Sequence, residues 1–125
     1  MEKSSPKSTT LPIALSFPQT TITLGNFQFL ASSGELFNHV DDGLEMWTGE
    51  GDRIVTEEIV FAKPFKASPI ITLGLTGMDC AHDQNLRFRL SAVNVSNKGF
   101  TIEFLTWEDT HFARASISWQ AVGEV

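Results

Sequence analysis

The C-terminal part of the chain alternates apolar and polar residues with a period of two. In GFTIEFLTW, Phe100, Ile102 and Phe104 alternate with polar neighbours, and HFARASISWQAV repeats the pattern with small and apolar residues. Successive side chains of an extended strand point to opposite faces, so each segment has one face suited to a core and one suited to solvent. Half-buried antiparallel strands of this kind predict an all-β sandwich.

Turn-forming segments such as ASSGE and SNKG separate the other extended segments. The predicted strands are residues 13–17, 20–24, 26–30, 53–61, 70–75, 86–95, 100–107 and 112–122. Residues 1–10 contain almost nothing to bury, which predicts a flexible tail. Helix signals are nearly absent, and the mixed polarity and two glycines of residues 34–47 predict an irregular loop with at most one short turn.

One predicted strand, NLRFRLSAVNV, carries two arginines on the same face. Its residues at positions 86, 88, 90 and 92 form an apolar face, and Arg87 and Arg89 lie on the opposite face with Ser91. A guanidinium on a strand face needs a partner or a ligand, so these two arginines are candidates for a binding site or an interface.

Size and charge exclude several classes of protein. A chain of 125 residues with 42% hydrophobic residues can bury one core of moderate size, which predicts one domain. With a net charge of −6, the chain lacks the basic surface that nucleic acids and anionic membranes require, so we expect neither as a partner.

No apolar stretch is long enough to span a membrane, and residues 11–17 are too short for a signal peptide. Localisation stays open between the cytoplasm and export by a non-classical route. The single cysteine, Cys80, cannot form an intrachain disulfide.

No residue pattern indicates a catalytic, metal or cofactor site. His39, His82 and His111 are far apart and lack the spacing of zinc ligands. The acidic segments GEGDR and DQN lack the regular oxygen spacing of a calcium loop, and TGEGDR lacks the strand and helix that flank a phosphate-binding loop. We therefore expect no enzyme activity, no metal and no cofactor.

Polar and aromatic residues gather where predicted strands begin or end. Glu50 and Asp52 precede one strand, Arg87 opens another, and Trp107 and Glu108 lie at the tip of a hairpin. Carboxylates and a guanidinium can hydrogen-bond sugar hydroxyls together, and an aromatic ring can pack against the apolar face of a sugar. These residue types indicate carbohydrate binding. The alternative is a salt-bridged strand end capped by a tryptophan.

Ordered landmarks run through most of the chain: the FAKPFKASP turn, an aspartate closing the next strand, an arginine opening the one after it, the NVSNKGF hairpin, the WEDT tip and a terminal ISWQAVG. At these residues the sequence resembles the H-type lectin domain family. This family comprises the galactose- and N-acetylgalactosamine-binding modules of snail agglutinins and of the C-terminal half of discoidins. The resemblance covers roughly residues 34–125, nearly three quarters of the chain.

The resemblance implies a six-stranded antiparallel β-sandwich that assembles as a homotrimer, with glycans bound in clefts between subunits. It places Arg87 and Trp107 at sugar-contacting positions of the family. Glu50, or Asp52 if the loop shifts, takes the place of a carboxylate that acts across the subunit interface. Glu108 stands where the best-known members have a histidine that holds the acetamide of N-acetylgalactosamine. That preference is therefore open, neutral galactose-like sugars remain expected ligands, and acidic sugars are disfavoured.

The resemblance also divides the chain into a tail at residues 1–10, an N-terminal β segment or oligomer contact at 11–33, and a lectin-like domain at 34–125. It lets the face of Arg89 turn toward a trimer axis, where Glu103 or another subunit's carboxylate would be its partner. Whether trimers pair into hexamers is open. The alternative function is a structural trimerisation module that has lost sugar binding, for which Glu108 is the main support. A hydrolase using Glu50 or Asp52 with Glu108 as a carboxylate pair is a third reading.

Overall fold

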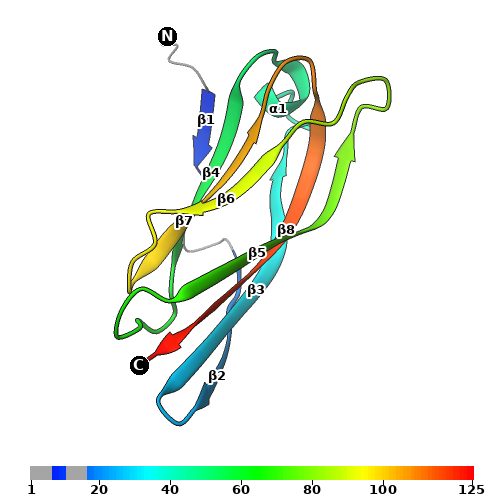
Figure 1. The fold of residues 1–125 in the computed structure, drawn as a ribbon. Coiled ribbons are helices and arrows are strands. Elements are labelled where there is room, and N and C mark those ends of the chain that lie inside the picture. Colours follow the sequence, from blue (N-terminus) through cyan, green and yellow to red (C-terminus); the bar gives the residue numbers. More distant parts are fainter. Residues whose placement is uncertain (1–6, 11–16) are drawn as a thin grey trace.

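Two β-sheets stack face to face in the computed structural model, which describes residues 7–10 and 17–125 (Figure 1). The strands are β1 (Lys7–Thr10), β2 (Thr20–Leu24), β3 (Phe27–Asn38), β4 (Arg53–Val60), β5 (Ile70–Cys80), β6 (Arg89–Val93), β7 (Gly99–Thr106) and β8 (Phe112–Glu124), with one short helix, α1 (Glu45–Thr48). The sheet orders are β1-β4-β7-β6 and β2-β3-β8-β5. All pairs are antiparallel except β1 with β4. The all-β sandwich is thus confirmed: β3 to β8 are its six strands, with β1 and β2 added at the edges.

Strands β4 and β7 each bury alternate residues, and for β7 the alternation of the sequence predicts this. Every second residue of these paired strands is buried, and the residues between them are more exposed. Trp119 of β8 lies at the centre with 1% of its surface exposed, and its ring contacts those of Phe61 and Phe100. Removing such a ring from a core costs about 3–5 kcal/mol, so this cluster is a main source of stability.

Strand β3 is longer than the sequence predicts. Residues 34–38, expected in an irregular loop, continue β3 and pair with β8 across a bulge between Glu35 and Phe37. The bulge adds one residue, so Leu36 and Phe37 both enter the core and the alternation is lost. The loop prediction, which rested on mixed polarity and two glycines, is wrong for these residues, because a bulged strand shows no clear alternation and tolerates Gly34. The short turn that was allowed for in this segment is present as α1.

Strand β6 starts at Arg89, later than the sequence predicts, and Leu86 is 48% exposed instead of lying on a core face. The threonine hydroxyls of Thr106 and Thr110 donate to the backbone carbonyls of Arg87 and Asn85. These carbonyls therefore bond to side chains, and residues 85–88 form a loop instead of extending the sheet.

At the N-terminus, Lys7–Thr10 pair with β4 as β1, although the sequence places them in a flexible tail. The pairing satisfies backbone groups along one edge of β4. Residues 1–6, and residues 11–16 with most of the predicted strand at 13–17, lie outside the described part of the chain. Strand β3 runs across residue 34, where the lectin-like domain was expected to begin. No helix in the described residues is long and apolar enough to cross a membrane.

The outer face of the β2-β3-β8-β5 sheet carries a row of apolar side chains, hereafter the outer apolar row. Ile22, Phe29, Val122 and Ile70 are paired in register across the four strands. Ile22 and Ile70 are 62% and 72% exposed, Phe29 is 40% exposed, and Val122 is half-buried. A single chain thus leaves a contiguous apolar surface in water.

Candidate functional site

Three loops meet at one end of the sandwich, hereafter the site end. Residues 49–52 lead into β4, residues 85–88 lead into β6, and residues 107–111 connect β7 to β8. The register pairs Arg53 with Thr106 and Arg89 with Leu105, so the starts of β4 and β6 both lie beside the end of β7. In Figure 1 this end also carries α1.

A hollow of about 370 Å³ lies between these loops. Its lining residues are Glu50, Gly51, Asp52, Arg87, Glu108 and Asp109. The fold thus brings together four of the five residues that the sequence singled out, within a single chain. The fifth, Trp107, is half-buried next to Glu108 and is not part of the lining. Asp109 is an additional member.

Arg87 points into this hollow as half of an ion pair. Its Nη1 donates to Asp109 Oδ1 at 2.8 Å and to Thr110 Oγ1 at 3.0 Å. The hydrogen bond from Arg87 holds the pKa of Asp109 below its usual value. A guanidinium has five N–H donors, so the remaining donors of Arg87 can still reach a ligand. These bonds hold the Arg87 side chain in place and leave other N–H groups to donate to a ligand.

Arg53, a residue that the sequence analysis did not assign to the site, ties the loops together. It is 1% exposed, and its three nitrogens donate to the backbone carbonyls of Gly51, Thr110 and Glu108 at 2.8–2.9 Å. Burial lowers the pKa of Arg53, and the nearby carboxylates, Glu50 first, oppose that shift. A single buried guanidinium therefore connects the loop before β4 with the hairpin tip that carries Glu108.

Two lining residues have backbone conformations that L-residues rarely adopt. Gly51 has φ of 76° and Glu108 has φ of 61°. The Glu108 carbonyl accepts hydrogen bonds from the backbone N–H of Gly51 and from Arg53 Nη2. A left-handed non-glycine residue costs about 1–2 kcal/mol, so these two bonds offset strain stored at the hairpin tip.

Glu50 also has a partner that sequence reasoning missed. Its Oε2 lies 3.0 Å from Nε2 of His111, whose ring stands edge-on to Trp47 of α1 with centroids 6.4 Å apart. His111 is separated from Glu50 by 61 positions and shares no motif with it. Only the pairing of loops at the site end brings the two together.

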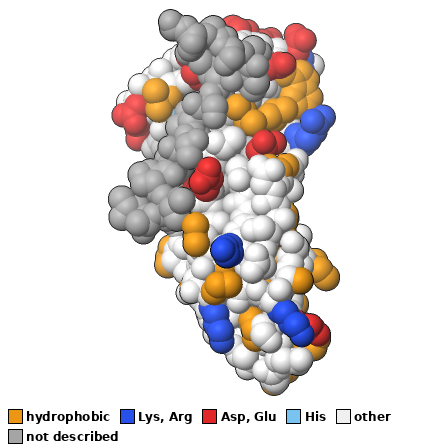
Figure 2. All heavy atoms as spheres, turned by 90° about the vertical axis from the view of Figure 1, so that its left-hand side faces the viewer, with side chains coloured by type: hydrophobic (Ala, Val, Ile, Leu, Met, Phe, Trp, Pro, Cys, Tyr) orange, Lys and Arg blue, Asp and Glu red, His pale blue; other side chains and the backbone are white. Residues whose placement is uncertain are grey.

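Negative charge dominates the hollow. Four lining residues are carboxylates and one is a guanidinium. Figure 2 shows acidic side chains concentrated toward the upper end of the molecule, with most of the basic ones in the lower half. Such a site repels anionic ligands and accepts hydrogen bonds from hydroxyl groups. No set of three His, Cys, Asp or Glu residues in the described residues is placed to hold a metal ion.

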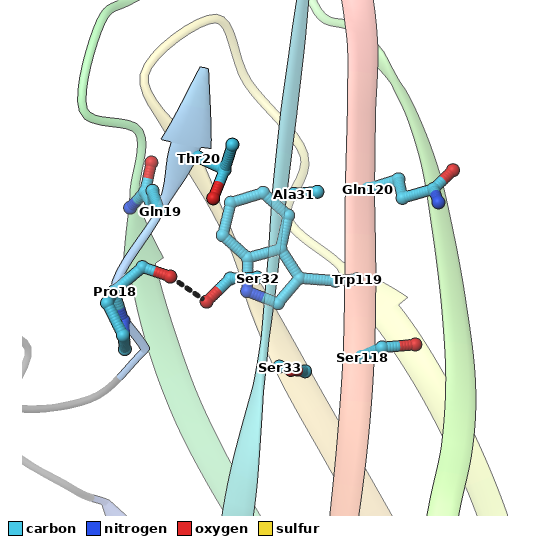
Figure 3. Close-up of a pocket in the computed structure, with 9 residues that line it drawn as sticks. All are labelled: Pro18, Gln19, Thr20, Ala31, Ser32, Ser33, Ser118, Trp119 and Gln120. Carbon is cyan, nitrogen blue, oxygen red and sulfur yellow. Dashed lines mark hydrogen bonds between the residues drawn. The ribbon is translucent and has the colours of Figure 1, made fainter. Parts of the chain in front are cut away.

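A larger hollow of about 490 Å³ lies elsewhere, between Pro18–Thr20 and strands β3 and β8 (Figure 3). Its lining is made of hydroxyl, amide and apolar groups with no charged side chain, and Ser32 Oγ donates to the Pro18 carbonyl across it. Its hydroxyl and amide groups can donate and accept, but it has none of the charged groups that strengthen hydrogen bonds in the smaller hollow. We therefore take the hollow at the site end as the candidate functional site.

Comparison with protein families gives one match in the same region. The family model of the H-type lectin domain matches residues 56–122, a range that includes Arg87, Trp107 and Glu108 and excludes Glu50 and Asp52. A Fuscovulum blasticum protein described as "ATP synthase subunits region ORF 7" is 41% identical over 90 residues, which cover 72% of this chain and 78% of that protein. Discoidin-2 of Dictyostelium discoideum is 32% identical over 62 residues, covering 48% of this chain and 24% of discoidin-2.

Solved structures share the fold. Recombinant discoidin II of Dictyostelium discoideum superposes with a TM-score of 0.68 at 20% identity, covering 81% of this chain and 38% of the discoidin chain. An N-truncated R1-type pyocin tail fibre superposes with a TM-score of 0.50 at 15% identity, covering 85% of each chain. At these identities the likeness shows a common two-sheet sandwich. The chain spans less than half the length of the discoidins that it matches.

Proposed function

The chain belongs to the H-type lectin domain family, and from this premise we propose that it binds terminal galactose- or N-acetylgalactosamine-type sugars in clefts between the subunits of a homotrimer. Membership of the family supports a carbohydrate-binding role in general. The observation that carries the proposal is the hollow at the site end, which collects a guanidinium and four carboxylates from loops distant in sequence. The proposed activity is binding, with no catalytic step.

The roles follow from hydrogen-bonding chemistry. Arg87 has N–H groups beyond those used by Asp109 and Thr110, and these donate to sugar oxygens. Glu50 and Asp52 accept from sugar hydroxyls. Trp107, adjacent to the hollow, packs against the apolar face of the sugar once a neighbouring subunit closes the cleft. The family resemblance implies that Glu50 or Asp52 acts from an adjacent subunit. Within a single chain both carboxylates already line the hollow with Arg87.

Specificity follows from charge. Glu108 and its neighbours accept from neutral hydroxyls but repel the carboxylates of acidic sugars. We therefore propose neutral galactose-like ligands, with N-acetylgalactosamine bound no better than galactose because Glu108 lacks the donor of a histidine. An open, hydrated site of this size gives an affinity on the order of millimolar to tens of micromolar, which several sites on one oligomer raise strongly on a glycan surface.

The outer apolar row supports assembly. The family resemblance turns the face of Arg89 toward a trimer axis, and the exposure of Arg89 in a single chain is compatible with that. The exposed apolar residues Ile22, Phe29 and Ile70 lie on the outer face of the other sheet. Apolar surface of this extent favours association. We propose that subunits meet through the β2-β3-β8-β5 sheet; pairing of trimers into hexamers is a further possible use of the exposed β2-β3 hairpin.

A glycan array with three proteins tests the proposal. Wild type should bind terminal galactosides and not sialylated or uronic-acid glycans, and Arg87→Ala should lose that binding. Arg89→Ala is the matched control, because Arg89 is exposed and outside the hollow. Light scattering should give the same oligomeric state for all three. An intact oligomer that binds no glycan would instead favour the structural trimerisation module.

A further inference from the structure

His111 is held at the site end by its own backbone. Its N–H donates to Gln84 Oε1 at 3.0 Å, and its carbonyl accepts from the N–H of Ala81 at 3.0 Å. Both partners lie in the segment between β5 and β6, the segment that also carries Arg87. The ring is therefore anchored to the loop that presents the arginine.

These contacts determine which ring nitrogen carries the proton. Because Gln84 Oε1 faces the His111 N–H, the Gln84 Nε2 amide group must face the ring, where it lies 2.6 Å from Nδ1. An amide NH₂ only donates, so Nδ1 accepts and has no proton. A neutral ring then has its proton on Nε2, which lies 2.9 Å from the Gly49 carbonyl and 3.0 Å from Glu50 Oε2.

We propose that neutral His111 is a positioning residue that orients Glu50 for sugar binding; this inference rests on the proposed function. The Glu50 side chain is 66% exposed, whereas that of His111 is 18% exposed. A freely rotating glutamate would lose rotamer entropy when it accepts a bond from a ligand. His111 Nε2, whose N–H donates to the Gly49 carbonyl, also lies 3.0 Å from Glu50 Oε2. Attraction between this N–H group and the carboxylate removes part of that loss in advance, and it leaves Glu50 Oε1 to accept from a sugar hydroxyl.

Protonation of the ring works against this arrangement. A proton on Nδ1 faces the N–H groups of Gln84, so Gln84 must turn away and release the His111 backbone. The carboxylates recorded around the ring, Glu50 and Asp109, then bind a cation, and Glu50 is drawn into an ion pair with it. Both changes weaken sugar binding, so a protonated ring should lower the affinity for a galactoside.

The variant Gln84→Glu tests the link from Gln84 through His111 to Glu50 without changing side-chain size. A carboxylate at position 84 accepts from both the His111 N–H and a protonated Nδ1, so it favours the charged ring. We expect weaker binding of methyl β-galactoside at pH 7 than in wild type. Binding by this variant that equals wild type at pH 7 would overturn the inference.

A double-mutant cycle tests the route through Glu50. Glu50→Ala should weaken methyl β-galactoside binding about tenfold, the loss expected for one hydrogen bond to a charged group, and His111→Ala should weaken it less because it removes only the positioning. The double variant should be no weaker than Glu50→Ala, because His111 acts only through Glu50. Losses that add in the double variant would contradict the positioning role.

A sugar-free measurement separates this inference from the proposed function. NMR of labelled wild type should show the Nε2–H tautomer of His111 at pH 7, and the Glu50 carboxyl resonance should shift as His111 titrates. That shift should disappear in His111→Ala. Absence of galactoside binding with this coupling intact refutes the proposed function alone. A Glu50 resonance that does not sense His111, or an Nδ1–H tautomer, refutes the positioning of Glu50.

Discussion

Arg53 determines the shape of the candidate site without lining it. Its guanidinium is buried at the start of β4, where it satisfies carbonyls of both adjoining loops. The planar fork of an arginine can serve three acceptors in fixed directions, which a lysine cannot. The backbone positions of Glu108 and of Thr110, whose hydroxyl accepts from Arg87, therefore depend on a residue that does not line the hollow.

Replacing Arg53 should disturb both stability and binding. Arg53→Met leaves the carbonyls of Gly51, Glu108 and Thr110 without this donor, and charge-assisted hydrogen bonds contribute about 1.5–3 kcal/mol each. We expect a loss of at least about 3 kcal/mol in the free energy of unfolding, measured by urea denaturation. Arg53→Lys should recover only a small part of it. Wild-type stability in Arg53→Met would contradict the role assigned here.

The residues that line the hollow were easier to predict from the sequence than those that support it. Arg87 and Glu108 stand at strand ends that match the family landmarks, so their positions singled them out. Arg53 carried a weaker signal: it shares the inward face of β4 with Val55 and Ile59, which is unusual for a charged residue. The contact between His111 and Glu50 had no signal, since it arises from the packing of two separate loops.

At the scale of elements, the candidate site is made of loops that the surrounding strands hold together, with a left-handed non-glycine residue at Glu108. Alternation in β7 and β8 predicted these strands from sequence, because each is half-buried. It failed for residues 34–38, where a bulge turns Leu36 and Phe37 to the same side. It also failed for residues 85–88, where side-chain hydroxyls take the place of a strand partner.

The two left-handed positions should respond differently to substitution. A Cβ added at Gly51 would meet no atom within 4 Å, so Gly51→Ala tests backbone conformation alone. We expect it to lower the free energy of unfolding by about 1–2 kcal/mol. Glu108→Gly should be roughly neutral, because relief of strain offsets the about 0.5–1 kcal/mol entropic cost of glycine. Thermal unfolding of both variants checks this, and a harmless Gly51→Ala would refute it.

His39 should make the segment around α1 sensitive to acid. Its ring is 3% exposed, its Nδ1 accepts from the N–H of Met46, and burial lowers its pKa. The unfolded chain takes up a proton below about pH 6.5 while the folded ring resists, so stability is complete above that pH and falls below it. The slope is at most about 1.4 kcal/mol per pH unit.

Urea denaturation at pH 7 and pH 5 measures this effect. Wild type should lose more stability on acidification than His39→Gln does. His82→Gln, which changes an exposed loop histidine, should behave as wild type. Equal pH dependence in wild type and His39→Gln would show that His39 does not contribute.

For the whole molecule, the two ends of the sandwich have different surfaces. The site end is acidic, and the β2-β3 hairpin toward the opposite end exposes Leu24 and Phe27 beside the outer apolar row. The sandwich itself was predictable from alternation and from the family landmarks. The outer apolar row was not, because the choice between a core face and an exposed face depends on which sheet lies opposite.

Introducing charge into the outer apolar row should disrupt the proposed trimer. Ile70→Lys places an ammonium in a face that buries apolar surface on association, so we expect monomers in light scattering at micromolar concentration. Val60→Lys is the matched control, since Val60 is 51% exposed and outside that row. It should keep the wild-type mass. An unchanged trimer in Ile70→Lys would move the interface to another face.

The most direct test of the proposed lectin function is to titrate methyl β-galactoside into ¹⁵N-labelled protein and follow the backbone amide resonances. The lining of the site-end hollow predicts shifts centred on Gly51, Arg87, Glu108 and Asp109, saturating at millimolar sugar or below. The same titration of Arg87→Ala should show none of them. Shifts confined to the larger hollow between Pro18–Thr20 and β8, or no shifts at all, would contradict sugar binding at this site.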